Sequence, residues 1–288
     1  MTAAPPERAG VVGGGFMGSG IAESVARAGI PVVVYEPDAA PLERGRARVR
    51  QSVARAVGGG KLSDDEAEAL VERIDWTTDM DALGASDLVV EAVTEDPAVK
   101  GPVFQAVDAR LAPQAVLASN TSSIPIAQLA SWTRTPERVI GLHFFSPVPV
   151  MRLIEVVVAL DTSDATVERA EAFARAIGKE AIRTRDRSGF IVNMLLVPYL
   201  MAAVRMLEDG FATREDIDKG MKLGAGHPMG PLALCDLIGL DVLYAVCDSL
   251  YEEFKRPEYA PPPLLKRMVV SGHHGRKTGR GFYDYDVT

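Results

Sequence analysis

Cysteine, histidine and tryptophan are scarce in this 288-residue chain, which contains two, four and two of them. Cys235 and Cys247 form no closely spaced pair, which excludes a thiolate zinc site, and we expect no metal in the protein. Two unpaired thiols are typical of the reducing cytoplasm. Histidine chemistry is restricted to four residues: His143, His227, His273 and His274.

Long hydrophobic runs and basic runs are also lacking. The most apolar stretch, residues 190–204, is interrupted by Asn193 and Pro198, whereas a membrane helix needs about 20 mostly apolar residues. Residues 1–8 lack the apolar core of a secretory signal. The net charge of −8 disfavours general nucleic-acid binding, and no basic amphipathic helix indicates a membrane surface. We therefore expect a cytoplasmic protein with neither nucleic acid nor membrane as partner.

Strand and helix patterns alternate through the first 187 residues. At 47% hydrophobic and 24% charged residues, the chain has the composition of a folded protein of about two domains. Short apolar runs predict strands at residues 10–12, 32–35, 88–90, 116–118, 139–144, 153–158 and 181–182. Helical patterns lie between most of them. Two consecutive helices, residues 40–57 and a second one from a capping box at Ser63–Glu66, predict an inserted helical hairpin.

Only helical patterns follow residue 187, over residues 190–207, 213–223, 232–254 with a break near Gly239, and 264–270. The pattern as a whole predicts an α/β fold with a Rossmann-like doubly wound sheet in residues 1–187. An all-α domain is expected over residues 188–288.

A glycine-rich turn lies between the first predicted strand and the helix that follows it. The segment Gly13–Gly18 satisfies G-x-G-x-x-G, in which Gly13 permits the tight turn, Gly15 lets a pyrophosphate approach and Gly18 allows close packing. Glu36 ends the second strand, where a carboxylate binds ribose hydroxyls and repels a 2′-phosphate. This context favours a dinucleotide site for NAD over an ordinary glycine turn.

One histidine and one glutamate lie in adjacent predicted strands. His143 is near the carboxyl end of its strand, the edge that faces the ligand crevice of a doubly wound sheet. Glu155 lies inside the next apolar strand, where an acid is costly unless it is paired. A His143–Glu155 pair would make a general base near neutral pH, although a purely structural histidine is the alternative.

Seven segments along the chain resemble the L-3-hydroxyacyl-CoA dehydrogenase family, and most of all its 3-hydroxybutyryl-CoA branch. They are Gly13–Gly20, Glu91–Glu95, Ser119–Ser123, His143–Met151, Gly189–Asn193, Met221–Pro231 and Lys277–Tyr283. The resemblance implies reversible oxidation of an (S)-3-hydroxyacyl-CoA to a 3-ketoacyl-CoA by NAD, with His143 as general base and acid and Glu155 orienting it. It also implies a homodimer through residues 188–288, with the NAD site and the catalytic pair in residues 1–187.

The same resemblance implies further site residues. Ser122 and Asn193 would hold the reacting end of the acyl-CoA. Residues on the cofactor side would be Phe16, Met17, Glu95, Lys100, Ser122, Ser146 and Lys277, and coenzyme A would contact Ser52 and Lys61 besides Ser122 and Asn193. Ser146 replaces the usual family asparagine, and we expect the chemistry to survive with altered affinity. Lys100 as a solvated helix residue and Asn193 as a helix cap are the alternatives.

Two other functions remain open at this point. One is a β-hydroxyacid dehydrogenase of the 6-phosphogluconate type, which relies on a catalytic lysine. The other is an NAD-binding protein without catalysis. For the acyl-CoA enzyme, acyl-chain length is left open, and fatty-acid β-oxidation, butanoate metabolism and polyester supply all use this step.

Overall fold

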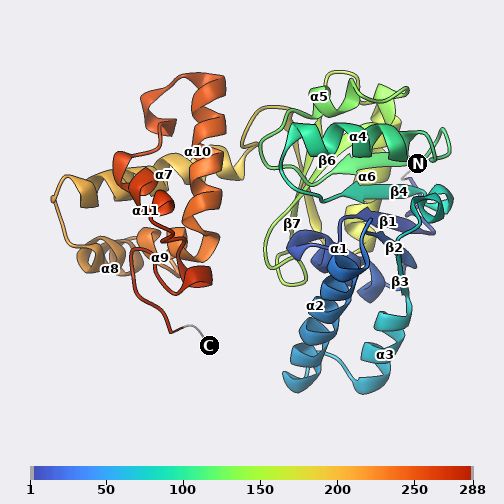
Figure 1. Ribbon diagram of the computed structural model, residues 1–288, viewed down its shortest axis with the longest axis horizontal. Helices are drawn as coiled ribbons and strands as arrows, with labels where there is room; N and C mark the ends of the chain where they lie inside the picture. Colours follow the sequence, from blue (N-terminus) through green and yellow to red (C-terminus); the bar gives the residue numbers. More distant parts are fainter. Residues whose placement is uncertain (1–2, 287–288) are drawn as a thin grey trace. The chain divides into compact units, whose positions relative to one another are not determined.

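The computed structural model describes residues 3–286, and the chain divides into two compact units that meet at Arg187 and Ser188 (Figure 1). Unit 1 contains the sheet, and unit 2 is helical.

Unit 1 is organised around one eight-stranded sheet with the order β3-β2-β1-β4-β5-β6-β7-β8. The strands are β1 (Ala9–Val12), β2 (Val32–Tyr35), β3 (Ile74–Thr77), β4 (Leu88–Glu91), β5 (Val116–Ser119), β6 (Val139–Phe144), β7 (Leu153–Val158) and β8 (Glu180–Arg185). All neighbouring strands pair in parallel except β6 and β7, which are antiparallel. The order of the first six is that of a dinucleotide-binding doubly wound sheet, as the sequence predicts.

The helices of unit 1 cover the sheet and form one projecting pair. They are α1 (Phe16–Arg27), α2 (Ala39–Gly58), α3 (Asp64–Glu72), α4 (Pro97–Asp108), α5 (Ile126–Ala130) and α6 (Asp164–Ala176), with short 3₁₀ turns η1 (Met80–Ala85) and η2 (Pro136–Arg138). Figure 1 shows α2 and α3 extending together away from the sheet, which confirms the inserted hairpin. The predicted capping box is present, because Ser63 Oγ accepts from the Glu66 amide at 3.2 Å and Glu66 accepts from the Ser63 amide at 2.8 Å.

One strand of the sheet was not predicted. In β3 only Ile74 is buried, and the strand forms a sheet edge that pairs with β2 alone. An edge strand with a single buried position produces no apolar run, so its sequence, Ile-Asp-Trp-Thr, gave no strand signal. For the same reason β8 is longer than the predicted residues 181–182, since it is largely exposed.

Unit 2 consists of helices around an aliphatic core. They are α7 (Val192–Glu208), α8 (Arg214–Gly224), α9 (Pro231–Ile238), α10 (Leu240–Phe254) and α11 (Pro263–Val270), with 3₁₀ turns η3 (Pro257–Tyr259) and η4 (Arg276–Thr278). The predicted break at Gly239 is confirmed, and its φ of 102° suits glycine. Within residues 3–286, no helix is both long and apolar enough to cross a membrane.

Candidate active site

The glycine turn presents backbone to the N-terminus of α1. Gly13 has a φ of 97°, and a Cβ on Gly18 would lie 1.8 Å from the Gly13 carbonyl oxygen, so neither position tolerates a larger residue. A Cβ on Gly15, by contrast, would meet nothing within 4 Å. No side chain caps α1 and no acid lies in its first turn. This open, uncapped N-terminus fits the pyrophosphate of a dinucleotide. Phe16 and Met17 follow in its first turn.

Glu36 lies beside this turn, as its spacing predicts. Its Oε1 accepts a hydrogen bond from the Gly14 amide at 2.7 Å. Arg48, on α2, approaches the same glycine, with its Nη1 3.4 Å from the Gly14 carbonyl oxygen. No sequence motif singles out Arg48, because the helical hairpin brings it back to the turn from a distant position.

His143 and Glu155 face each other across the β6–β7 pair, in which they are register partners. His143 Nδ1 lies 2.7 Å from Glu155 Oε2, and both side chains are buried. Because an ionised carboxylate only accepts hydrogen bonds, the proton of the neutral ring belongs on Nδ1, and Nε2 is left with its lone pair. The predicted pair is therefore assembled, and Nε2 is the ring nitrogen left for a second partner.

Ser122 lies on the other side of the imidazole. Its Oγ is 3.1 Å from His143 Nε2. The loop after β5 is anchored to β6, since Asn120 Oδ1 accepts from the Phe144 amide at 2.9 Å. Ser122, His143 and Glu155 thus form a continuous hydrogen-bonded chain.

Glu95 holds the segment that contains Ser122. Its Oε1 accepts from Thr121 Oγ1 at 2.6 Å and from the Ser122 amide at 2.8 Å. Burial opposes ionisation of Glu95, but the positive charge of Lys100 and hydrogen bonds from residues 121–123 hold its pKa below the ordinary value. The carboxylate is therefore charged at neutral pH.

Lys100 is buried, so the alternative of a solvated helix residue is wrong. Its side chain is 1% exposed, and Nζ lies 2.6 Å from Glu91 Oε1 and 3.3 Å from Glu95 Oε2. Glu91 is fully buried at the end of β4 and also accepts from Ser119 Oγ at 2.7 Å. Sequence reasoning missed this role of Glu91, whose only signal was an acid that ends an apolar strand.

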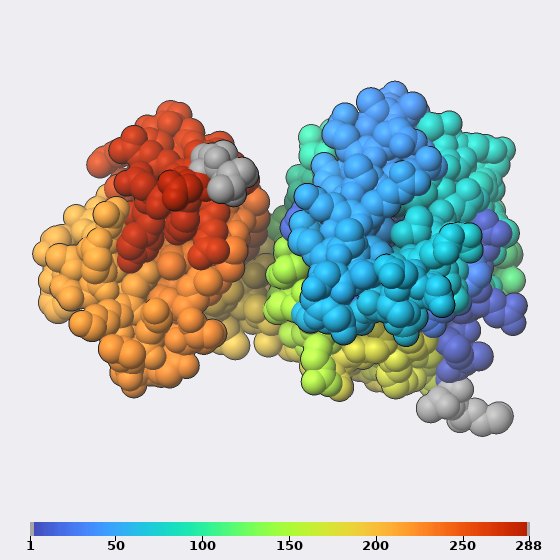
Figure 2. Space-filling view, turned by 90° about the horizontal axis from the view of Figure 1, so that it is seen from below, coloured from blue at the N-terminus to red at the C-terminus, as the bar shows by residue number. Residues whose placement is uncertain are grey.

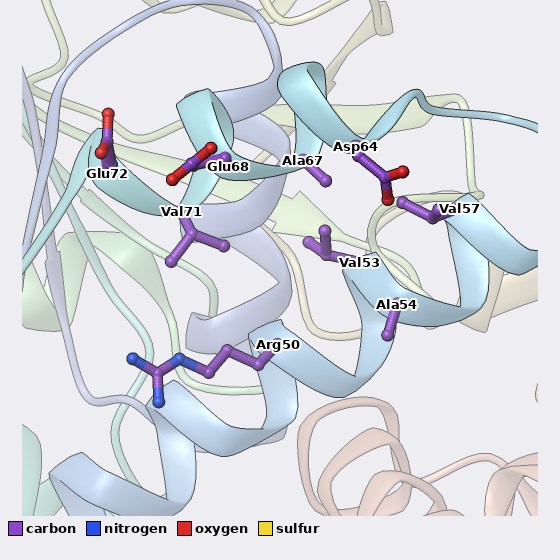
Figure 3. Close-up of a pocket in the computed structure, with 9 residues that line it drawn as sticks. All are labelled: Arg50, Val53, Ala54, Val57, Asp64, Ala67, Glu68, Val71 and Glu72. Carbon is purple, nitrogen blue, oxygen red and sulfur yellow. The ribbon is translucent and has the colours of Figure 1, made fainter.

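The residues predicted to contact coenzyme A in unit 1 lie on the hairpin, Ser52 on α2 and Lys61 in the turn after it. Neither residue lines the groove between α2 and α3. The side chains that line this groove include Arg50 and three acidic residues (Figure 3). The residues that line it are Arg50, Val53, Ala54, Val57, Asp64, Ala67, Glu68, Val71 and Glu72. The acidic side chains of this groove repel the phosphates of coenzyme A. The groove therefore does not support the prediction that Ser52 and Lys61 contact coenzyme A.

Two predicted site residues belong to unit 2. Asn193 is the second residue of α7, whose N-cap is Ile191, so the alternative that Asn193 caps the helix is wrong. Lys277 lies in η4, where its Nζ is 2.6 Å from Asp241. Among the other histidines, His227 Nδ1 lies 3.1 Å from the Tyr199 hydroxyl. His273 and His274 are partly buried.

Two family models match the chain. The NAD-binding domain of 3-hydroxyacyl-CoA dehydrogenase matches residues 8–187, and the C-terminal domain of the same enzymes matches residues 189–285.

Individual relatives match over nearly the full chain. A 3-hydroxybutyryl-CoA dehydrogenase of Mycobacterium tuberculosis is 54% identical over 281 residues, which are 97% of this chain and 98% of that protein. The crystal structure of M. tuberculosis FadB2 is similar with a TM-score of 0.97 at 53% identity, and covers 98% of this chain and 100% of that one. For (S)-3-hydroxybutyryl-CoA dehydrogenase PaaH1 from Ralstonia eutropha, the TM-score is 0.93 at 43% identity, over 97% and 99% of the two chains.

Proposed function

Because the chain belongs to the 3-hydroxyacyl-CoA dehydrogenase family, we propose that it catalyses the reversible, NAD-dependent oxidation of (S)-3-hydroxybutyryl-CoA to acetoacetyl-CoA. The observation that supports this most strongly is the buried His143–Glu155 pair, with Nδ1 and Oε2 at 2.7 Å and Nε2 turned toward Ser122. Such a pair is suited to remove a proton from a secondary alcohol.

In this mechanism His143 Nε2 accepts the proton of the 3-hydroxyl group. Glu155, which is fully buried, stabilises the imidazolium that forms and keeps the ring oriented. When substrate binds, the Ser122 hydroxyl would turn its proton from Nε2 to the substrate oxygen and so align that oxygen with Nε2. NAD, when bound, supplies the hydride acceptor. In the direction of reduction His143 returns the proton to the oxygen of the ketone.

The cofactor is assigned to the glycine turn and the residues beside it. The uncapped N-terminus of α1 and the open space over Gly15 would hold the pyrophosphate, and Glu36 would bind the ribose. Ser146 and Lys277 keep their proposed roles on the cofactor side, as does Asn193 toward the substrate. Glu95 and Lys100 would act there through their mutual ion pair as well as by direct contact.

The two alternative functions differ from the proposed one in the residues that they require. A dehydrogenase of the 6-phosphogluconate type needs a catalytic lysine, whereas the buried lysine near this site, Lys100, is held between two carboxylates. A non-catalytic NAD-binding protein would have no use for a buried base aligned with a hydroxyl.

Steady-state kinetics on a panel of substrates test the proposal. Acetoacetyl-CoA, longer 3-ketoacyl-CoAs and free 3-keto acids are each offered with NADH and NADPH. We expect turnover of acetoacetyl-CoA with NADH to exceed all other combinations. Turnover of a free acid in preference to the thioester would support the β-hydroxyacid alternative. Tight NADH binding without turnover of any acyl-CoA would support the non-catalytic one.

We also propose a division of labour between the units and a cellular setting. Unit 1 would bind NAD and carry the catalytic pair, whereas unit 2 would contribute to acyl-CoA binding and form a homodimer. The two buried free thiols, Cys235 and Cys247, support a reducing cytoplasm.

A further inference from the structure

A buried lysine outside the catalytic pair is bound to the loop between β6 and β7. Lys179 follows α6 and precedes β8, and it is 8% exposed. Its Nζ donates to the Val148 carbonyl oxygen at 2.7 Å and to the Met151 carbonyl oxygen at 2.8 Å. Among residues 3–286, no carboxylate lies within ion-pair distance of this ammonium group. Burying an ammonium group costs free energy when only backbone carbonyls accept its hydrogen bonds. We therefore expect the two contacts of Lys179 to have a structural or functional role.

The loop held by Lys179 joins the two catalytic strands. It runs through residues 145–152, between the strand of His143 and that of Glu155. The Phe145 ring packs edge-on against the His143 ring, with centroids 4.7 Å apart. Ser146 follows next, at the position proposed to contact the cofactor. The tip of the loop reaches the surface of unit 1, where it is visible in yellow-green in Figure 2.

The same loop also docks on the cofactor helix. Val148 is buried against α1, and a Cβ on Gly20 would lie only 3.0 Å from Val148 Cβ. The amides of Val150 and Met151 both donate to the Pro147 carbonyl oxygen, at 2.9 and 3.0 Å, so the loop is a tight turn. Any shift of this turn would therefore move residues next to His143 and next to α1 together.

Apart from the packing of Phe145 and Val148, the loop has, within residues 3–286, a single ion pair to anchor it, and that pair is exposed. Arg152 forms a long contact of 3.4 Å with Glu180, and both side chains are at least 75% exposed. A pair so exposed contributes little to stability. Burial, and then the charge of Arg27, lower the pKa of Lys179, and the Val148 and Met151 carbonyl oxygens accept the hydrogen bonds of its Nζ.

We propose that Lys179 is a positioning residue for the reaction: its two carbonyl hydrogen bonds hold the 145–152 loop so that Phe145 and Ser146 stay aligned beside His143. The kinetic consequence rests on the proposed function, whereas the effect on the loop does not.

Three variants test this inference. Lys179→Met removes the donors and keeps an apolar stem, Lys179→Arg keeps a cation that can donate, and Arg152→Ala is the matched control, which removes an exposed cation from the same loop. Since a misplacement of about 1 Å can cost 10²-fold, we expect Lys179→Met to lower kcat for acetoacetyl-CoA by about 10- to 100-fold. Lys179→Arg should recover part of the loss, and Arg152→Ala should resemble the wild type.

Two further readouts separate positioning from general stability. Hydrogen–deuterium exchange of Lys179→Met should increase in residues 145–152 and stay unchanged in β1, β4 and β5. The double variant Lys179→Met/Ser146→Ala should lose less activity than the product of the two single losses, because both changes act through one loop. Should Lys179→Met fail to fold, Lys179→Leu, which also lacks a donor, serves in the same comparisons.

Wild-type kcat in Lys179→Met, unchanged exchange in the loop, or increased exchange throughout the sheet would each overturn the inference. If the wild-type protein does not reduce acetoacetyl-CoA, the proposed function fails instead. Hydrogen exchange then decides the role of Lys179 in the loop without any assay of turnover.

Discussion

A carboxylate buried against an imidazole changes what both groups can do. Glu155 has no solvent to stabilise its charge, and the hydrogen bond to His143 Nδ1 partly replaces that solvation. The same contact fixes the tautomer of the ring and favours its protonated form once a proton arrives at Nε2. The pair is therefore matched to a reaction in which His143 alternates between base and acid.

Replacement of Glu155 by glutamine tests this matching. The amide can still accept from Nδ1, but its missing charge leaves the imidazolium unstabilised. We expect kcat for acetoacetyl-CoA reduction to fall by about 10²–10⁴-fold. NADH affinity, measured by fluorescence titration, should stay within about twofold of wild type. Loss of both activity and NADH binding would show that Glu155 serves folding instead.

For single residues, the sequence predicted a site residue where its type was unusual for the predicted strand. Glu155 stood out as an acid in an apolar strand, and His143 as a histidine at a strand end. No local pattern distinguished Lys100 or Lys179, because lysine is ordinary in a helix or before an exposed strand, and Lys100 was predicted only through the family resemblance. Only the three-dimensional structure shows that both are buried, one between two glutamates and the other on two carbonyls.

At the scale of helices, strands and turns, the turn into α1 depends on three glycines that have different roles. A Cβ on Gly18 would collide with the Gly13 carbonyl oxygen at 1.8 Å, whereas a Cβ on Gly15 would point into open space. Gly18 is thus required by the fold, whereas Gly15 is not, and we propose that the ligand requires it.

Two alanine substitutions separate these requirements. Gly15→Ala should leave Tm unchanged and weaken NADH binding by about 1–3 kcal/mol, or roughly 5- to 150-fold in Kd, because the methyl group occupies space needed by the pyrophosphate. Gly18→Ala should lower Tm itself. Calorimetry and NADH titration of both variants provide the measurement. Wild-type NADH affinity in Gly15→Ala would contradict the placement of the cofactor.

A buried ion pair joins the end of α4 to the segment before β6. Asp108 accepts from Arg138 Nη2 at 2.6 Å and from the Arg134 amide at 3.0 Å. Burial opposes ionisation of Asp108, but these hydrogen bonds and charges hold its pKa below the ordinary value. The carboxylate therefore stabilises the fold above its unfolded-state pKa of about 3.9, and this contribution is lost as the pH falls through the lower folded-state pKa.

Asp108→Asn should lower the free energy of unfolding by about 3–5 kcal/mol at neutral pH, because it leaves Arg138 buried without its counter-charge. Thermal unfolding at a series of pH values should show a constant difference in Tm between the two proteins from pH 7 to about 5. The difference should shrink below about pH 4, as Asp108 is protonated in the wild type. A difference that persists undiminished at about pH 2 would show that charge is not its cause.

The elements with a buried face were predictable and those without were not. Strands such as β1 and β4 are buried along their whole length and produce continuous apolar runs. Strand β3 has one buried residue, and its place is set by pairing with β2, which no local pattern expresses. The hairpin of α2 and α3 was recognisable because its capping box is a local signal.

For the molecule as a whole, net charge says little about its ligands. The chain carries a net charge of −8, whereas both NAD and coenzyme A are anions, so binding depends on local features such as the uncapped N-terminus of α1.

Unit 2 exposes several large apolar side chains, among which Phe211, Leu223 and Val270 are each more than three quarters exposed. These exposed apolar side chains are candidates for the proposed interface with a second copy.

Sedimentation velocity at micromolar concentration tests the homodimer. We expect a single species of twice the 30.8 kDa chain mass. Charged substitutions at Phe211 and Leu223 should shift it toward the monomer if these side chains lie in the interface. A wild-type monomer at that concentration would contradict the proposed assembly.

The most direct test of the central claim, that His143 is the acid–base group of a 3-hydroxyacyl-CoA dehydrogenase, is the kcat of His143→Ala with acetoacetyl-CoA and NADH. The mechanism predicts a loss of about 10²–10⁴-fold relative to a wild type that turns over this substrate, with NADH affinity retained. Near-wild-type turnover by His143→Ala would contradict it.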